Sequence, residues 1–119
     1  MKLNSILVMT FIIFLGGCSI AQPNTGYYWE NYAGTLYNFK QSPDENSRKK
    51  HESELNKIIT KAATKGSRVP PGIHAELGYM LAKSGNKSAA IQHLEMEIAI
   101  YPESKTFIER ILLMLGLED

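Results

Sequence analysis

The chain has 119 residues, which is enough for one small domain. Its 13 Lys and Arg side chains nearly balance 12 Asp and Glu side chains, so the charge gives no argument for a nucleic-acid partner, and none is expected. A single cysteine excludes an internal disulfide bond.

The first residues have the pattern of a secretory signal. Lys2 gives a positive start, residues 3–15 are mostly apolar, and two glycines precede Cys18. The apolar segment is too short for a comfortable membrane span, which needs about 20 apolar residues. We therefore predict that residues 1–17 are a cleaved signal peptide.

The four residues Leu-Gly-Gly-Cys that end at Cys18 resemble the bacterial lipobox. The resemblance implies that the Cys18 thiol is lipidated, with palmitate-type chains, and that Cys18 becomes the new N-terminus. Several acyl chains make an effectively permanent anchor, because each buried CH₂ contributes about 0.8 kcal/mol. Ser19 rather than Asp follows, which by the same resemblance favours the outer membrane. The alternative is a plain secreted protein with an incidental cysteine.

The segment after the cysteine has no hydrophobic periodicity. Residues 19–25 are small or polar and include a proline, which is typical of a linker. We predict that residues 18–25 form a lipidated tether and that residues 26–119 form the folded domain.

Residues 26–40 are the most aromatic part of the chain. Aromatic and aliphatic side chains recur there at helical spacing, which predicts a helix over residues 28–39. This face either packs in the core or forms a patch for a partner, because aromatic side chains are enriched at both. The candidate partner-binding residues are Tyr28, Trp29, Tyr32 and Tyr37.

A long helix is predicted over residues 43–65. Ser42 is its expected cap, since Pro43 suits a first helical position and Glu45 can close a capping box. Its second half carries an apolar stripe, whereas residues 46–54 are almost wholly polar and are expected to project into solvent or fray.

Residues 71–102 resemble one tetratricopeptide repeat, a helical hairpin closed by Pro102. The features in the expected order are Leu77-Gly78, Gly85, Ala90, Leu94 and Pro102. Gly78 and Ala90 let two helices, predicted over residues 71–83 and 87–100, approach closely. Glu97 stands where the repeat has a second small residue, and we expect it to weaken the contact to a following hairpin.

A last helix is predicted from Pro102 to about residue 115, with an apolar face made of Phe107, Ile108, Ile111, Leu112 and Leu115. It would cap the stack, and residues 28–65 would be a degenerate earlier repeat. The predicted fold is all-α, a short tetratricopeptide-like stack of about five helices, because a lone hairpin cannot bury its apolar face.

Basic side chains gather between residues 48 and 68, with seven basic against two acidic residues, a balance of +5. Lys57, Lys61 and Lys65 repeat every fourth position and so share one stripe of a helix. The stripe is either a solvated face or a contact for anionic lipid or an acidic partner.

The residue pattern offers little for catalysis. His51, His74 and His93 lack metal-ligand spacing, and no glycine-rich phosphate loop occurs, so no metal, cofactor or enzyme activity is expected. The acidic residues near the end of the second hairpin helix, Glu95, Glu97 and Glu103, are expected on helical surfaces without a paired partner.

The motif Tyr27-Tyr28-Trp29-Glu30-Asn31-Tyr32, followed by Leu36-Tyr37, resembles a family of small bacterial lipoproteins known only as a domain of unknown function. Family members open with a Tyr-x-Trp-Gly-x-Tyr signature, so Glu30 stands where they usually have Gly. They tend to be encoded beside a lipoprotein similar to the curli secretion channel. The resemblance implies a part in an outer-membrane assembly or export apparatus, with that lipoprotein as a candidate partner.

These features predict a non-enzymatic interaction or assembly component, lipid-anchored at the periplasmic face of the outer membrane. Two alternatives remain. One is an enzyme that acts on cell-wall material, for which location is the only motive. The other is a surface-exposed antigen without an internal partner.

Overall fold

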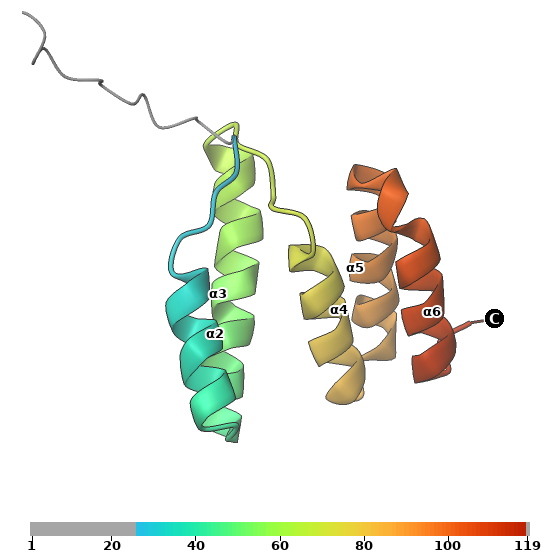
Figure 1. Ribbon diagram of the computed structural model, residues 1–119, viewed down its shortest axis with the longest axis horizontal. Helices are drawn as coiled ribbons and strands as arrows, with labels where there is room; N and C mark the ends of the chain where they lie inside the picture. The colour runs from blue at the N-terminus through green and yellow to red at the C-terminus, as the bar shows by residue number, and fades with distance from the viewer. Residues whose placement is uncertain (1–25, 119) are drawn as a thin grey trace, which may run out of the picture.

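The computed structural model describes residues 26–118, which contain five α-helices and one 3₁₀ turn. In chain order these are α2 (Tyr32–Gln41), α3 (Glu45–Thr64), α4 (Ile73–Lys83), α5 (Lys87–Ile100), η1 (Pro102–Ser104) and α6 (Lys105–Leu115). Figure 1 shows the helices side by side, with their axes along a common direction. No strand occurs among these residues, so the predicted all-α stack of helical hairpins is confirmed for them. The predicted signal peptide, Cys18 and the tether lie outside the described residues.

The core consists of two clusters, and α4 contributes to both. One cluster joins α3 to α4, and Tyr32 and Phe39 of α2 pack against it. The other joins α4, α5 and α6. Buried members of the first cluster are Leu55, Ile58, Ile73, Leu77 and Met80, and those of the second are Ala75, Ala90, Leu94, Ile108 and Leu117. The α4 helix therefore ties the first hairpin to the rest of the stack.

The hairpin of α4 and α5 has the close contact that the sequence predicts. A Cβ atom on Gly78 would lie 2.8 Å from Leu94 Cγ and 3.0 Å from the carbonyl oxygen of Ala90. Ala90 and Leu94 are themselves fully buried. At the turn, Gly85 has φ 88, the left-handed conformation that glycine adopts without strain.

Gly78→Leu should therefore force the two helices apart. We expect a loss of about 1–3 kcal/mol in the free energy of unfolding, because extra methylene groups in a filled core displace their neighbours. Urea unfolding followed by circular dichroism measures this loss. Ala99→Leu, at an exposed position of α5, is the matched control and should change stability little. An unchanged urea midpoint for Gly78→Leu would contradict the close crossing.

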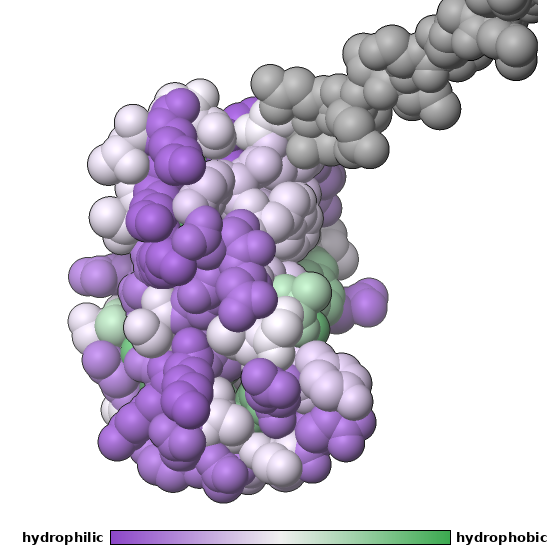
Figure 2. All heavy atoms as spheres, turned by 90° about the vertical axis from the view of Figure 1, so that its left-hand side faces the viewer, coloured by the Kyte–Doolittle hydropathy of each residue, from purple (hydrophilic) through white to green (hydrophobic). Residues whose placement is uncertain are grey.

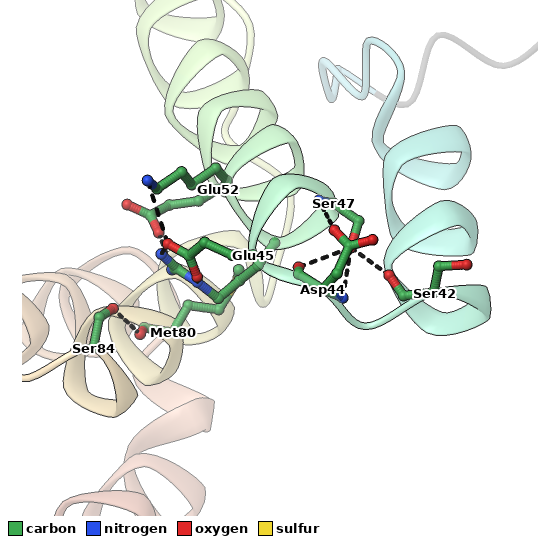
Figure 3. A network of polar contacts seen from close by, with 9 residues as sticks. Ser42, Asp44, Glu45, Ser47, Glu52, Met80 and Ser84 are labelled. Atoms are coloured by element: carbon green, nitrogen blue, oxygen red, sulfur yellow. Dashed lines mark hydrogen bonds and ion pairs between the residues drawn. The ribbon is translucent and has the colours of Figure 1, made fainter.

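Asp44, and not Ser42, caps α3, which begins at Glu45. The Asp44 carboxylate accepts a hydrogen bond from the Ser47 backbone N–H at 2.8 Å, and the Ser47 hydroxyl accepts one from the Asp44 N–H at 3.2 Å. Figure 3 shows this capping box beside Ser42, whose carbonyl oxygen accepts a hydrogen bond from the Ser47 hydroxyl. Pro43 thus precedes the cap rather than starting the helix.

The polar first half of α3 neither projects into solvent nor frays, and that expectation was wrong. Ser47, His51 and Glu54 are buried. The α2 helix and the residues on either side of it pack along this half. The Ser47 hydroxyl donates to a carbonyl oxygen of the turn before α3, the His51 ring lies 2.8 Å from a hydroxyl of α2, and the Glu54 carboxylate accepts from the N–H just before α2. Burial therefore leaves none of the three without a hydrogen bond. The opposite, outward side of the α2–α3 hairpin is predominantly hydrophilic, as Figure 2 shows.

The α2 helix begins at Tyr32, four residues later than predicted, because the residues before it run along α3. The Arg68 N–H donates to the Gly26 carbonyl at 2.7 Å, and the Asn31 N–H donates to the Glu54 carboxylate at 2.8 Å. Glu30 has φ 43, in the left-handed region, which costs a residue with a Cβ atom about 1–2 kcal/mol. This conformation gives a physical reason for a glycine at that position of the motif.

Glu97 is not a surface residue, and it does not loosen the stack. Its side chain is buried, and its carboxylate accepts hydrogen bonds from the Gly72 N–H at 2.7 Å and the Ala75 N–H at 3.3 Å. A carboxylate at this place satisfies unpaired N–H groups and complements the positive end of the helix dipole. Glu97 of α5 therefore caps α4, which starts at Ile73 rather than at Pro71.

The last helix is built largely as predicted, with one error. Ile108 is buried, while Ile111, Leu112 and Leu115 pack partly buried against the second cluster, and Gly116 ends the helix with φ 63. Phe107, however, is 60% exposed. No helix among the described residues is long and apolar enough to cross a membrane.

Candidate functional site

Two hollows lie on either side of one face of α4, and they share Glu76 and Tyr79 of this helix. The mixed hollow is lined by α2, the start of α3 and α4, and the apolar hollow by α4 and α6. The mixed hollow, of about 550 Å³, is lined by Phe39, Lys40, Glu45, Arg48, Glu76, Tyr79, Met80, Lys83 and Ser84. The apolar hollow, of about 450 Å³, is lined by Gly72, Ala75, Glu76, Tyr79, Phe107, Ile111 and Met114. Because the shared residues Glu76 and Tyr79 lie about one turn apart on α4, the two hollows adjoin each other.

The apolar hollow collects exposed hydrophobic side chains. Phe107 and Met114 of α6 are 60% and 67% exposed, and Tyr79 of α4 faces them from the other wall. Three of the seven large hydrophobic residues that are exposed in the described part line this one hollow: Tyr79, Phe107 and Met114. Grouped exposed apolar surface of this kind marks a site of interaction more often than single exposed residues do.

The mixed hollow carries charge at its rim. Arg48 is already bound, with Glu45 at 2.9 Å and Glu52 at 2.6 Å. Figure 3 shows Glu45 and Glu52 beside α4, near Met80 and Ser84. Lys40 and Lys83, in contrast, form no ion pair with any described residue. The charged side chains at this rim that have no described ion-pair partner are therefore both positive.

Glu76, where the hollows meet, joins three helices. One oxygen of its carboxylate accepts a hydrogen bond from the Tyr32 hydroxyl at 2.8 Å, and the other lies 3.0 Å from Nε2 of His51. The other ring nitrogen of His51 lies 2.8 Å from the Thr35 hydroxyl, and the ring is fully buried. Burial and the bond to Glu76 raise the pKa of Tyr32 to about 12. Since both carboxylate oxygens have protein partners, the arrangement positions α2, α3 and α4 around the hollows.

Glu76→Ala should destabilise the fold by about 2–4 kcal/mol, because it leaves the buried His51 ring and the Tyr32 hydroxyl without their acceptor. Glu76→Gln keeps the shape of the side chain and one acceptor oxygen, so this variant should lose less free energy of unfolding than Glu76→Ala. Chemical denaturation of both variants measures the difference. Glu109→Ala removes an exposed pair with Lys105 and serves as the control, with almost no expected change. Equal stability of Glu76→Ala and wild type would refute the joining role.

The other two histidines meet between α4 and α5. The Nδ1 atoms of His74 and His93 are 2.9 Å apart, and the rings stack with centroids 5.1 Å apart. Burial, and the like charge of His93, lower the pKa of His74 to about 4, and burial lowers the pKa of His93 as well. One neutral ring can then donate to the other. Among the described residues no group of three or more His, Cys, Asp or Glu side chains could hold a metal ion.

The four aromatic candidates do not form one site, and none of them lines either hollow. Tyr32 packs on the core and binds Glu76, and the Trp29 ring lies 5.5 Å from it with 42% of the residue exposed. The Tyr28 hydroxyl contacts the Glu30 carboxylate. Tyr37 is 63% exposed, one helical turn before Lys40 of the mixed hollow. Their role in binding a partner stays a prediction.

Prediction from the sequence did not single out Tyr79 and Met114, and it placed Phe107 on the core-facing side of the last helix rather than at a binding site. A signal existed on the last helix, where Phe107, Ile111 and Met114 are spaced i, i+4 and i+7 beside the core stripe of Ile108 and Leu112. A helix with two apolar stripes has more hydrophobic surface than one neighbour can cover.

The stripe of three lysines holds the segment before α2 against α3. Lys57 lies 2.5 Å from the Glu30 carboxylate and Lys61 3.7 Å from it, while the Lys65 amine lies 4.8 Å from the centre of the Tyr28 ring. The hydrogen bond with Lys57 lowers the pKa of Glu30 to about 2. Two of the three charges are therefore committed within the domain.

The chain thus belongs to the class of small all-α proteins built as a stack of helical hairpins, with a hollowed face on one side. A family model described as "Domain of unknown function (DUF4810)" matches residues 27–111, and the chain belongs to this family. The match starts at Tyr27, the first residue of the aromatic motif, and confirms the predicted membership of a family of unknown function. Comparison with curated proteins and with solved structures gave no significant match.

Proposed function

We propose that this protein is a non-enzymatic adaptor that binds a segment of a protein partner on the face lined by α2, α4 and α6. The observation that carries the proposal is the apolar hollow between α4 and α6, where Tyr79, Phe107 and Met114 remain exposed. Burying such side chains against a partner is favourable by about 25 cal/mol per Å² of apolar area removed from water.

The chemistry of the two hollows describes the segment that would bind. An apolar side chain of the partner enters the apolar hollow between Phe107 and Tyr79. An acidic group of the partner lies near Lys40 and Lys83 at the rim of the mixed hollow, where no described carboxylate neutralises them. Tyr37, exposed one turn before Lys40, extends the contact surface along α2.

The pattern of residues 71–102 supports the same use. Its spacing resembles a tetratricopeptide repeat, and such repeats present extended concave surfaces to peptide partners. In such a stack the first helix of each hairpin lines the concave side, which corresponds here to α2, α4 and α6. The proposal treats α6 as the first helix of a repeat that lacks its second helix.

The proposed location rests on the residues before the described domain. The lipobox-like sequence ending at Cys18 supports lipidation, and Ser19 supports the outer membrane over the inner membrane. With the family resemblance, these features support an assembly or secretion component at the periplasmic face, and a channel-like lipoprotein similar to that of curli secretion is the candidate partner.

Site-specific cross-linking in native membranes tests the partner. A photoreactive amino acid replacing Tyr79 or Met114 should give one discrete adduct at native expression levels, and Phe107→Ser should abolish it because the apolar wall is lost. The same photoreactive group at Thr60, an exposed position on α3 that lines neither hollow, is the control and should give no such adduct. A protein that never cross-links from the hollows, and that is recovered alone after mild solubilisation, would overturn the adaptor proposal.

Cys18→Ala tests the anchor separately. We expect the variant to lose its partition into membranes while its helical circular dichroism spectrum is unchanged, because the described domain starts eight residues later. Fractionation of the cell envelope measures the partition. A variant that still sediments with membranes after high-salt washing would contradict the lipid anchor.

A further inference from the structure

We propose that the end of the domain from which the anchor segment departs is a membrane-contact surface, in which Lys65 and Arg68, each set against a tyrosine ring, rest on the anionic lipid leaflet that holds Cys18. This inference rests on the lipid anchor of the proposed function and goes beyond it, because it assigns an orientation to the domain.

The start of the described chain and the turn after α3 are fixed to each other. The Arg68 N–H donates to the Gly26 carbonyl at 2.7 Å, and the Tyr28 N–H donates to the Arg68 carbonyl at 3.3 Å. Figure 1 shows the segment before α2 and the segment after α3 meeting at the C-terminal end of α3. Whatever precedes Gly26 therefore leaves the domain beside residues 65–68.

The length of the tether keeps this end near the membrane. Seven residues lie between Cys18 and Gly26, which makes eight steps along the chain, and an extended chain spans at most about 3.3–3.6 Å per step. The end of the domain at Gly26 can therefore lie no farther than about 29 Å from the anchor. The domain can rotate so that the two hollows face away from the bilayer, but the end of the domain at Gly26 cannot move far from the bilayer.

The side chains at this end suit a lipid headgroup layer. The Lys65 amine lies 4.8 Å from the centre of the Tyr28 ring, and the Arg68 guanidinium lies 5.2 Å from that of Tyr27 and 5.5 Å from that of Tyr101. Both basic residues are exposed. Basic and amphipathic aromatic residues side by side are typical of the interface between membrane and water.

The side chains at this end that form no ion pair within the described domain carry a net positive charge, which can attract anionic lipid. Lys57 and Lys61 face the Glu30 carboxylate, and Lys57 also lies 3.8 Å from that of Glu54, so the two acids offset the two lysines. Lys65 and Arg68 form no ion pair with a described carboxylate, because an aromatic ring rather than an acid faces each of them. Glu103 of η1 is the exposed acidic residue nearest in sequence to Tyr101, and one carboxylate does not offset the two cations of Lys65 and Arg68.

The test uses the processed, lipidated chain reconstituted into vesicles and a water-soluble reagent that labels lysine amines, with mass spectrometry as the readout. On vesicles of phosphatidylethanolamine and phosphatidylglycerol, labelling of Lys65 should fall at least about fivefold relative to vesicles in which phosphatidylcholine replaces the anionic lipid, as expected for about one surface-bound cation. Lys40 and Lys83, exposed at the mixed hollow, are internal controls and should label equally on both.

Arg68→Gln removes one cation without touching the lysine that is read out. It should return most of the Lys65 labelling on anionic vesicles, whereas Arg110→Gln, the same change at an exposed position of α6, should not. High salt should act like Arg68→Gln, since screening weakens the attraction.

The outcomes separate this inference from the proposed function. If the spectrum shows acylated Cys18 but Lys65 is labelled equally on anionic and neutral vesicles, the membrane contact is overturned and the lipid anchor stands. A Cys18 peptide without lipid overturns the anchor and this inference together. Failure of the cross-linking at Tyr79 would overturn the partner proposal and leave the membrane contact standing.

Discussion

The partly buried carboxylate of Glu76 is the constraint on which the arrangement of the helices depends. It binds the Tyr32 hydroxyl from α2 and the His51 ring from α3, while its own backbone belongs to α4. Apolar packing alone tolerates sliding, because hydrophobic burial has no direction. Hydrogen bonds to both oxygens of one carboxylate do have a direction, so they fix the first hairpin in one register on the second.

That register also shapes the candidate binding face. Glu76 lines both hollows, so the group that sets the contact between the hairpins also forms the wall that the hollows share. On the other side of α4, Gly78 allows close contact with α5, and Glu97 of α5 caps the first turn of α4. The α4 helix is therefore held from both sides, and Tyr79 is presented from a rigid element, which reduces the entropy lost on binding.

Local rules predicted the helices well where the signals are local. Residues 87–100 were predicted with the observed bounds because a turn glycine and a proline enclose them. The polar contacts could not be predicted in this way, since Tyr32 and Glu76 are 44 positions apart and nothing in either neighbourhood indicates the other. His51 lies in a polar stretch that resembles a solvated helix, and only the packing of α2 against it makes it a core residue. The placement of Phe107 in the core was wrong for a related reason. Periodicity identifies an apolar stripe on a helix, but it does not show which neighbouring helix covers that stripe.

The pairing of Gly26 with Arg68 has a mechanical consequence. Any pull on the N-terminal segment enters the domain at the end of α3 and is shared among the Gly26–Arg68 hydrogen bond, the contact of Glu30 with Lys57 and the bond from Asn31 to Glu54 before it reaches α2. Because these contacts are spread along α3, the load acts as shear on several bonds together rather than opening them one after another. None of the residues in these three contacts lines either hollow, so a pull on the segment would reach the hollows only after these contacts.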